Sequence, residues 1–157
     1  GNAWFVQSLD YVNDANEEMN WLNDFRADSA AVADVKFKDI LGEAKAVAAG
    51  DTIFETSYAP KQLTYHAKTQ NGGVAVFSEI YFPWGWEAEI DGKPAQIGRV
   101  NYVLRAMRIP AGSHNVKMTF NPKEVDTSDT IATCAILAIY LLVFAAFNFT
   151  LYRRLRQ

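Results

Sequence analysis

Two glutamates, Glu87 and Glu89, lie two positions apart in the segment WEAEI. On a strand this spacing puts both carboxylates on one face, where one could act as an acid and the other as a base. However, the alternation with Trp86, Ala88 and Ile90 is that of an ordinary half-exposed strand, and the carboxylate pairs of glycosidases face each other across a cleft. We therefore expect neither glutamate to be catalytic.

The other reactive side chains do not form a recognisable set. Neither His66 nor His114 has a second metal-ligating residue at helical spacing. Ser113 lies in an expected hairpin turn, without the G-x-S-x-G context that exposes a nucleophile. No glycine-rich loop opens a helix in the manner of a phosphate site. The sequence therefore predicts no catalytic residue, no metal site and no cofactor.

The segment YFPWGW gathers aromatic side chains around a reversal of the chain. Trp84 lies on the turn itself, where an exposed indole could stack on a sugar ring or lie at a membrane interface. Trp86 shares a strand face with Ala88 and Ile90, so we expect it to pack in the core. Trp84 and Tyr81 are the candidate contact residues for a glycan or for the membrane interface.

Strands and turns must position these residues, and the chain between residues 52 and 120 has the pattern of about six short strands. QLTYHAK alternates apolar and polar residues, as a strand with one wet face does, whereas GGVAVFSEIYF is apolar on both faces and should be central. Asp91-Gly92 favours a hairpin, because a type I′ turn needs positive φ at both central positions. AGS predicts another tight reversal. The pattern predicts a mainly β fold, an antiparallel β-sandwich.

The segment before residue 52 is more mixed. GNAWFVQSLDYV predicts one or two short strands. Asp14 can cap a short N-terminal amphipathic helix, because Glu17 three positions later completes a capping box. Further on we expect a strand near 30–33 and a helical turn near 37–41. The apolar stripe of the expected helix consists of Ala15, Met19 and Leu22.

Residues 130–152 carry no charged side chain. As a helix, these roughly 23 residues would extend about 34 Å, which exceeds the ~30 Å hydrocarbon core of a bilayer. A chain of 157 residues has too little other apolar mass to bury such a helix on every side. We therefore expect a transmembrane helix in contact with the lipid bilayer, with alanines that would let a neighbouring helix approach closely.

The uncharged run is followed by YRRLRQ, and short basic flanks tend to stay in the cytoplasm. The expected order is an extracytoplasmic β-rich domain over 1–129, a transmembrane helix over 130–152 and a cytoplasmic basic tail over 153–157. A tail-anchored protein with a cytosolic domain is the rival interpretation, which would put the arginines on the wrong side. The start GNAWFVQSLD lacks the features of a signal peptide, so we expect a removed signal peptide or a longer parent protein.

The charge balance excludes some partners. The chain has 15 basic and 18 acidic residues, and setting aside the three arginines of the tail leaves the domain near −6. This acidic balance argues against nucleic acid or anionic headgroups as a partner. The single cysteine, Cys134, lies within the expected span, so no disulfide framework supports the domain.

A family resemblance covers nearly the whole chain. The ordered segments GNAWFV, ANEEMNWLNDF, TSYAPKQLTYHAKT, GGVAVFSEIYFPWGWEAEIDGKP and NYVLRAMRIPAGSHNVKMTF, followed by a single terminal span, resemble the C-terminal end of bacterial YfhO-like membrane proteins. The most specific parts are residues 77–92 and 101–120. Members are similar to GT-C type glycosyltransferases, with many membrane helices, an extracytoplasmic β-rich region and a last helix. The resemblance implies that this chain is a C-terminal piece, with the upstream transmembrane helices of its parent as partners.

In GT-C enzymes the acidic catalytic residue lies in an early extracytoplasmic loop, and a polyprenyl-phosphate sugar is the usual donor. No position of this chain corresponds to that loop. The resemblance therefore implies an accessory part, which holds an acceptor or braces the catalytic loops of a glycosyltransferase acting on cell-envelope polymers at the bacterial cell membrane. The alternative is a non-enzymatic envelope protein whose β-domain binds a glycan or a protein partner. An Asp or Glu pair in the first extracytoplasmic loop of the parent would distinguish the two.

Overall fold

The computed structural model describes residues 2–155, and their side chains except at 24, 123–126, 149–151 and 153. The chain divides into two compact units, Gly1–Asn121 and Pro122–Gln157. The last strand of the first unit ends at Phe120, and the final helix begins at Lys123.

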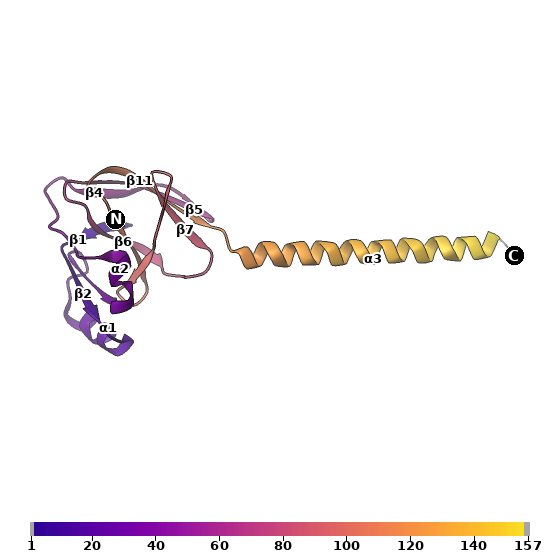
Figure 1. Cartoon of the computed structure of the whole chain (residues 1–157), viewed down its shortest axis with the longest axis horizontal. Helices are drawn as coiled ribbons and strands as arrows, with labels where there is room; N and C mark the ends of the chain where they lie inside the picture. The colour runs from indigo at the N-terminus through magenta and orange to yellow at the C-terminus, as the bar shows by residue number, and fades with distance from the viewer. Residues whose placement is uncertain (1, 156–157) are drawn as a thin grey trace. The chain divides into compact units, whose positions relative to one another are not determined.

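A four-stranded antiparallel sheet forms one part of the first unit (Figure 1). Its order is β1–β6–β10–β9, and the strands span Ala3–Val6, Gly73–Ile80, Leu104–Ile109 and Gly98–Val100. β6 is a central strand, as its apolar sequence predicts, because it pairs with β1 on one edge and with β10 on the other. Its residues from Gly73 to Phe77 are all buried.

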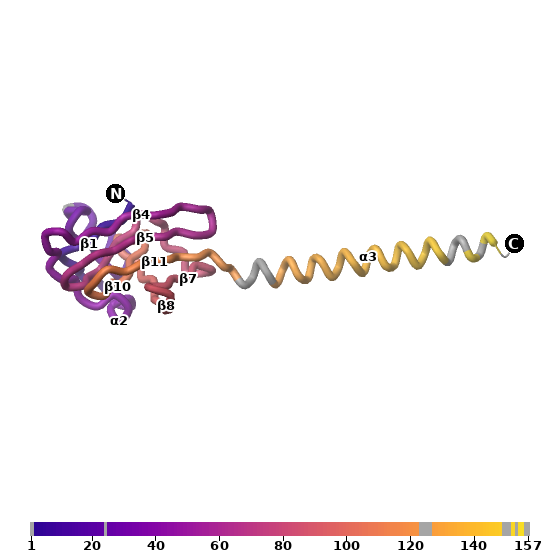
Figure 2. The backbone as a smooth tube through the Cα atoms, turned by 90° about the horizontal axis from the view of Figure 1, so that it is seen from above, coloured from indigo at the N-terminus to yellow at the C-terminus, as the bar shows by residue number. Residues whose placement is uncertain are grey.

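A five-stranded antiparallel sheet has the order β4–β5–β11–β7–β8 (Figure 2). Its strands span Thr52–Ala59, Gln62–Thr69, Gly112–Phe120, Trp86–Ile90 and Lys93–Ala95. The predicted wet face of β5 is confirmed, since Leu63, Tyr65 and Ala67 are buried and the residues between them are not. The hairpin between β7 and β8 turns at Asp91 and Gly92, with φ of 51° and 76°, as the Asp-Gly signal predicts.

A third sheet pairs β2 (Ser8–Val12) with β3 (Ala30–Asp34) in parallel. Parallel neighbours need a crossover, which α1 (Ala15–Trp21) and η1 (Leu22–Asp24) provide. The strand near 30–33 was expected, but its parallel pairing was not. The helical turn expected near 37–41 is α2 (Lys38–Leu41), preceded by η2 (Val35–Phe37).

Two clusters of buried residues hold the first unit together. The first takes side chains from both large sheets, and the rings of Tyr65 and Phe77 meet edge to face across it at 4.8 Å. The second packs β2, β3 and α2 against the four-stranded sheet. The mainly β class, with antiparallel sheets and one C-terminal apolar helix, is therefore confirmed. The first cluster consists of Ala3, Phe5, Leu63, Tyr65, Ala67, Ala75, Phe77, Ala88, Met107, Ile109, Val116 and Met118.

Helix α1 begins where the capping signal places it. The Asp14 carboxylate accepts hydrogen bonds from the backbone N–H groups of Asn16 and Glu17 at 2.8 and 2.9 Å. The amphipathic character of the helix is not confirmed, because Ala15 and Met19 of the expected stripe are exposed. Its buried residue is Glu18.

Glu18 docks α1 through an ion pair instead of an apolar stripe. Its carboxylate is fully buried and lies 2.6 Å from Arg99 Nη2. It also accepts the backbone N–H of Tyr102 at 2.7 Å. A buried carboxylate is costly unless it is paired and hydrogen-bonded. The partners of Glu18 lie about 80 positions away in the chain, so a local hydropathy pattern cannot reveal this contact.

The second unit contains α3 (Lys123–Leu155). Its stretch Thr127–Asn148 is long and apolar enough to cross a membrane, and none of the side chains described there is buried. The polar Asn148 satisfies its amide within the helix, because Nδ2 donates to the carbonyl of Phe144 at 2.8 Å. This internal pairing lowers the cost of an amide in an apolar environment.

Removing the Glu18 carboxylate tests how α1 is held. We expect Glu18→Ala to lower the free energy of unfolding by about 2 to 4 kcal/mol, because Arg99 and the Tyr102 N–H lose their acceptor. The lower end of this range is expected, since Arg99 is partly exposed. Asn20→Ala, at an exposed position of the same helix, is the control. Denaturant titration of the full chain in detergent measures both, and equal midpoints would contradict the docking role.

Candidate binding site at the aromatic turn

The turn between β6 and β7, residues 81–85, is tied at both ends by backbone hydrogen bonds. The N–H of Tyr81 donates to the carbonyl of Val103 at 2.7 Å. The carbonyl of Gly85 accepts the N–H of Asn121 at 2.6 Å. Gly85 has φ of 92°, a conformation that favours glycine. The aromatic side chains are therefore presented by a turn of fixed backbone.

Trp86 directly follows this turn and is the first residue of β7. It is half-buried against the first core cluster, and its ring lies 5.2 Å from that of Phe120. The guanidinium of Arg105 stacks over the indole at 4.0 Å from the ring centroid. The expectation that Trp86 packs in the core agrees with this position, although the guanidinium is a neighbour that the strand pattern did not indicate.

Arg105 is a buried cation without a carboxylate partner among the described residues. Its Nε donates to the carbonyl of Ile80 at 2.9 Å. Burial lowers the pKa of Arg105, and the charge of Glu79 opposes this shift. An arginine stays protonated even so. The Trp86 ring, the Ile80 carbonyl, the Met118 sulfur and the charge of Glu79 all stabilise it.

Trp84 lies on the outside of the turn. Its side chain is 63% exposed, and its ring contacts that of Phe82 at 5.2 Å in a T-shaped arrangement. Tyr81 is half-buried, with its ring 5.6 Å from that of Phe37. Of the two candidate contact residues, Trp84 is therefore open to solvent and Tyr81 is partly enclosed.

One groove beside the turn, called here the acidic groove, has a volume of about 500 Å³. It brings together aromatic residues of the turn with residues of β7, Glu87 and Glu89 among them, and with Gln96. Neither Glu87 nor Glu89 forms an ion pair within the part of the chain that the structure describes. The residues that define it are Tyr81, Phe82, Trp86, Glu87, Glu89 and Gln96.

A second groove, called here the basic groove, also has a volume of about 500 Å³ and contains both Tyr81 and Trp84. Its two cations are already paired, Lys36 with Asp34 at 2.9 Å and Arg99 with Glu18 at 2.6 Å. The remaining lining is apolar or aromatic. The basic groove therefore carries little free positive charge.

A hydrogen-bonded chain on the outer face of the five-stranded sheet was not visible in the sequence. Ser113 Oγ lies 3.1 Å from His66 Nε2, and His66 Nδ1 lies 3.1 Å from Asn115 Oδ1. This is the order of a nucleophile, a base and an orienting group. However, a neutral amide does not stabilise an imidazolium as a carboxylate does, and Ser113 and Asn115 are exposed. We interpret these contacts of Ser113, His66 and Asn115 as hydrogen bonding between the side chains of neighbouring strands β5 and β11.

The second histidine serves a hairpin. His114 Nδ1 lies 2.6 Å from the Asp91 carboxylate, which also accepts the N–H of Asn115 at 2.8 Å. The Asp91 contact raises the pKa of His114, and the two donors lower the pKa of Asp91. This pair holds the turn between β7 and β8 against β11. Among the described residues, no group of three or more His, Cys, Asp or Glu could hold a metal ion.

Alanine variants of the two tryptophans should differ in stability. Trp86→Ala removes the ring that covers Arg105, so we expect a loss of about 3 kcal/mol in the free energy of unfolding. Trp84→Ala should cost less than about 0.5 kcal/mol, because the side chain is largely exposed. Thermal or denaturant unfolding of the full chain in detergent provides the comparison. Equal losses would mean that Trp84 also belongs to the core.

Comparisons with protein-family models, with curated proteins and with solved structures find no match for this chain. The resemblance to YfhO-like proteins thus stays a prediction. The site has to be interpreted from its own geometry, which combines an aromatic turn with two grooves of different charge.

Proposed function

We propose that this chain is a membrane-anchored module that holds a saccharide outside the cytoplasm, as an accessory part of a glycosyltransferase acting on cell-envelope polymers. The single observation that carries the proposal is the acidic groove, a cavity lined by residues of the aromatic turn together with polar residues of β7 and Gln96. The β unit supplies this groove, and α3 supplies the anchor.

The chemistry of the acidic groove suits a sugar. The apolar faces of sugar rings pack on aromatic side chains such as Tyr81 and Phe82, and hydroxyl groups bond to amides such as that of Gln96. A volume of about 500 Å³ lies within the roughly 300–1,000 Å³ of small-molecule sites. Because the domain is acidic, the ligand is a neutral or amine-bearing saccharide, not an anionic one.

The anchoring part of the proposal depends on α3. Its stretch Thr127–Asn148 has the length and composition of a membrane span. Basic residues follow this stretch, and the positive-inside tendency puts them in the cytoplasm. The β unit would then face the extracytoplasmic side, where envelope polymers are assembled.

We also infer that the two large sheets form an antiparallel β-sandwich. Support comes from the first core cluster, which draws on β1, β6 and β10 of one sheet and on β5, β7 and β11 of the other. In a sandwich the turns gather at the ends of the sheets. A turn such as 81–85 is then free to carry ligand contacts without disturbing the core.

The proposed role is accessory because the only paired carboxylates near the groove, Glu87 and Glu89, are neighbours on one strand of the described chain. The resemblance to YfhO-like proteins supports a longer parent of the GT-C type, in which upstream helices would pack beside α3. The catalytic residues would belong to that upstream part.

Saccharide titration of the full chain in detergent tests the groove. We expect neutral or amine-bearing mono- and disaccharides to change the tryptophan fluorescence, with heats of binding measurable by calorimetry. Phe82→Ala and Gln96→Ala should each weaken binding about three- to tenfold, because a stacking face or a hydrogen bond is lost.

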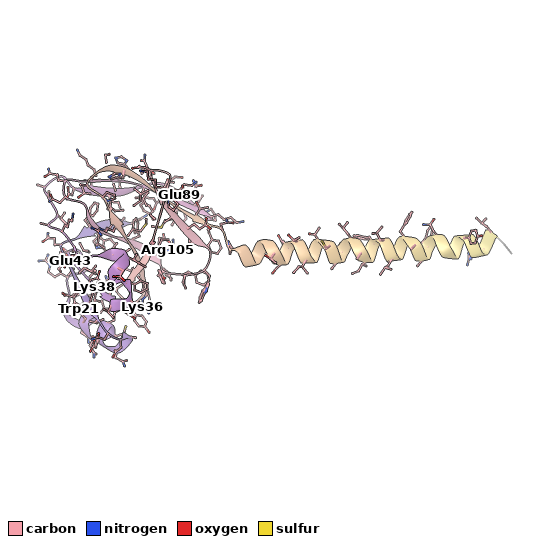
Figure 3. All side chains as sticks on the ribbon, in the orientation of Figure 1. Trp21, Lys36, Lys38, Glu43, Glu89 and Arg105 are labelled. Atoms are coloured by element: carbon pink, nitrogen blue, oxygen red, sulfur yellow. The ribbon has the colours of Figure 1, made fainter. Side chains whose placement is uncertain are left out.

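Glu43→Ala is the matched control, since it removes an exposed carboxylate that does not line the groove (Figure 3). It should leave the affinity unchanged. If none of the saccharides tested binds, or if the Glu43 variant loses as much affinity as the groove variants, the proposed function is wrong.

A further inference from the structure

Exposed apolar side chains of the first unit gather on two adjacent loops. Nine large apolar side chains described in this unit are exposed, and five of them belong to the segments 80–84 and 102–103. The backbone hydrogen bond from Tyr81 to Val103 holds the two segments together at 2.7 Å. We call these five the aromatic patch: Ile80 (70% exposed), Phe82 (46%), Trp84 (63%), Tyr102 (39%) and Val103 (46%).

The members of the aromatic patch are contiguous. Ile80, Trp84, Tyr102 and Val103 all line the basic groove. Phe82 joins them through its ring contact with Trp84 at 5.2 Å. Soluble domains rarely expose a contiguous apolar surface of this kind unless another molecule covers it. We therefore expect another molecule to cover the aromatic patch.

The position of the patch in the chain indicates which occupant. Gly85, the last residue of the turn, is hydrogen-bonded to Asn121, the last residue of the first unit. Asn121 precedes Thr127, where the apolar stretch of α3 begins, by only about six residues, which cannot extend beyond about 20 Å. Wherever α3 enters a bilayer, the covalent chain keeps this end of the turn near the bilayer surface.

The side chains suit a bilayer interface. Trp and Tyr are enriched at the headgroup level, where a ring can be apolar on one side and hydrogen-bonded on the other. The nearby cations Lys36 and Arg99 are neutralised by Asp34 and Glu18. The patch is thus apolar and nearly uncharged, so zwitterionic headgroups fit it without the repulsion that an acidic domain meets at anionic ones.

We propose that the aromatic patch inserts into the headgroup region of the bilayer that α3 crosses, with Trp84 among the side chains in contact with lipid. The contact would hold the first unit against the membrane surface, with Phe82 shared between the aromatic patch and the acidic groove. This inference relies on the proposed membrane anchor but not on saccharide binding, so the two can fail separately.

Lipid quenching of tryptophan fluorescence tests the contact. The full chain is reconstituted in phosphatidylcholine vesicles with or without lipid brominated at the top of the acyl chains. We expect clear quenching in the native sequence, and Trp84→Phe should remove at least about half of it. Trp21→Phe, which removes the indole of α1 instead (Figure 3), should leave the quenching unchanged.

A second variant keeps the test sharp if Trp84→Phe changes the local packing. Ile80→Glu with Val103→Glu introduces charge at two exposed positions of the patch and should reduce the quenching of Trp84 while the unfolding midpoint stays the same. Equal quenching in the Trp84→Phe and Trp21→Phe proteins, or quenching that soluble saccharide abolishes, would overturn the proposal. If alkaline washing removes the protein from the vesicles, both this proposal and the proposed membrane anchor are wrong. If the patch variants bind saccharide with unchanged affinity, the proposed saccharide binding in the acidic groove is unaffected.

Discussion

The stacking of Arg105 on Trp86 is the contact on which the aromatic turn depends. Arg105 belongs to β10 in the four-stranded sheet and Trp86 begins β7 in the five-stranded sheet, so their contact at 4.0 Å joins the two sheets where the turn leaves them. The guanidinium is buried and also donates to the carbonyl of Ile80, the last residue before the turn. Both ends of the turn are therefore fixed by one cation, which the ring and the carbonyl help to stabilise because no described carboxylate forms an ion pair with it.

This constraint separates two tryptophans that are neighbours in sequence. Trp86 is held inward under the guanidinium, and Trp84 is left 63% exposed on the other side of Gly85. The same turn then borders an acidic groove and an almost neutral apolar patch. We propose different ligands for them, since a saccharide needs both stacking faces and hydrogen-bonding groups, whereas a lipid interface needs exposed aromatic area with little charge.

Local signals explain what could be predicted from the sequence. The Asp91-Gly92 hairpin, the wet face of β5 and the Asp14 cap each depend on a few consecutive residues, and the structure contains all three. The burial of Glu18 was missed, because its partner Arg99 is distant in the chain and a charged residue on a helix is normally exposed. The parallel pairing of β2 and β3 was missed for a similar reason, since a strand pattern does not specify its neighbour. The two grooves are lined by residues from several elements. The segment YFPWGW therefore indicated some of their lining residues but not the shape of either groove.

The central claim is that the turn makes two different contacts through its two sides, and fluorine NMR of the chain labelled with fluorotryptophan tests it most directly. The chain has four tryptophans, so each resonance can be assigned by a single Trp→Phe variant in the full chain embedded in lipid nanodiscs. The account predicts that a spin-labelled headgroup broadens the Trp84 resonance alone, and that a neutral or amine-bearing saccharide shifts the Trp86 resonance while that of Trp84 stays in place. Trp84 and Trp86 responding together to either addition, or Trp84 unaffected by the spin label, would contradict it.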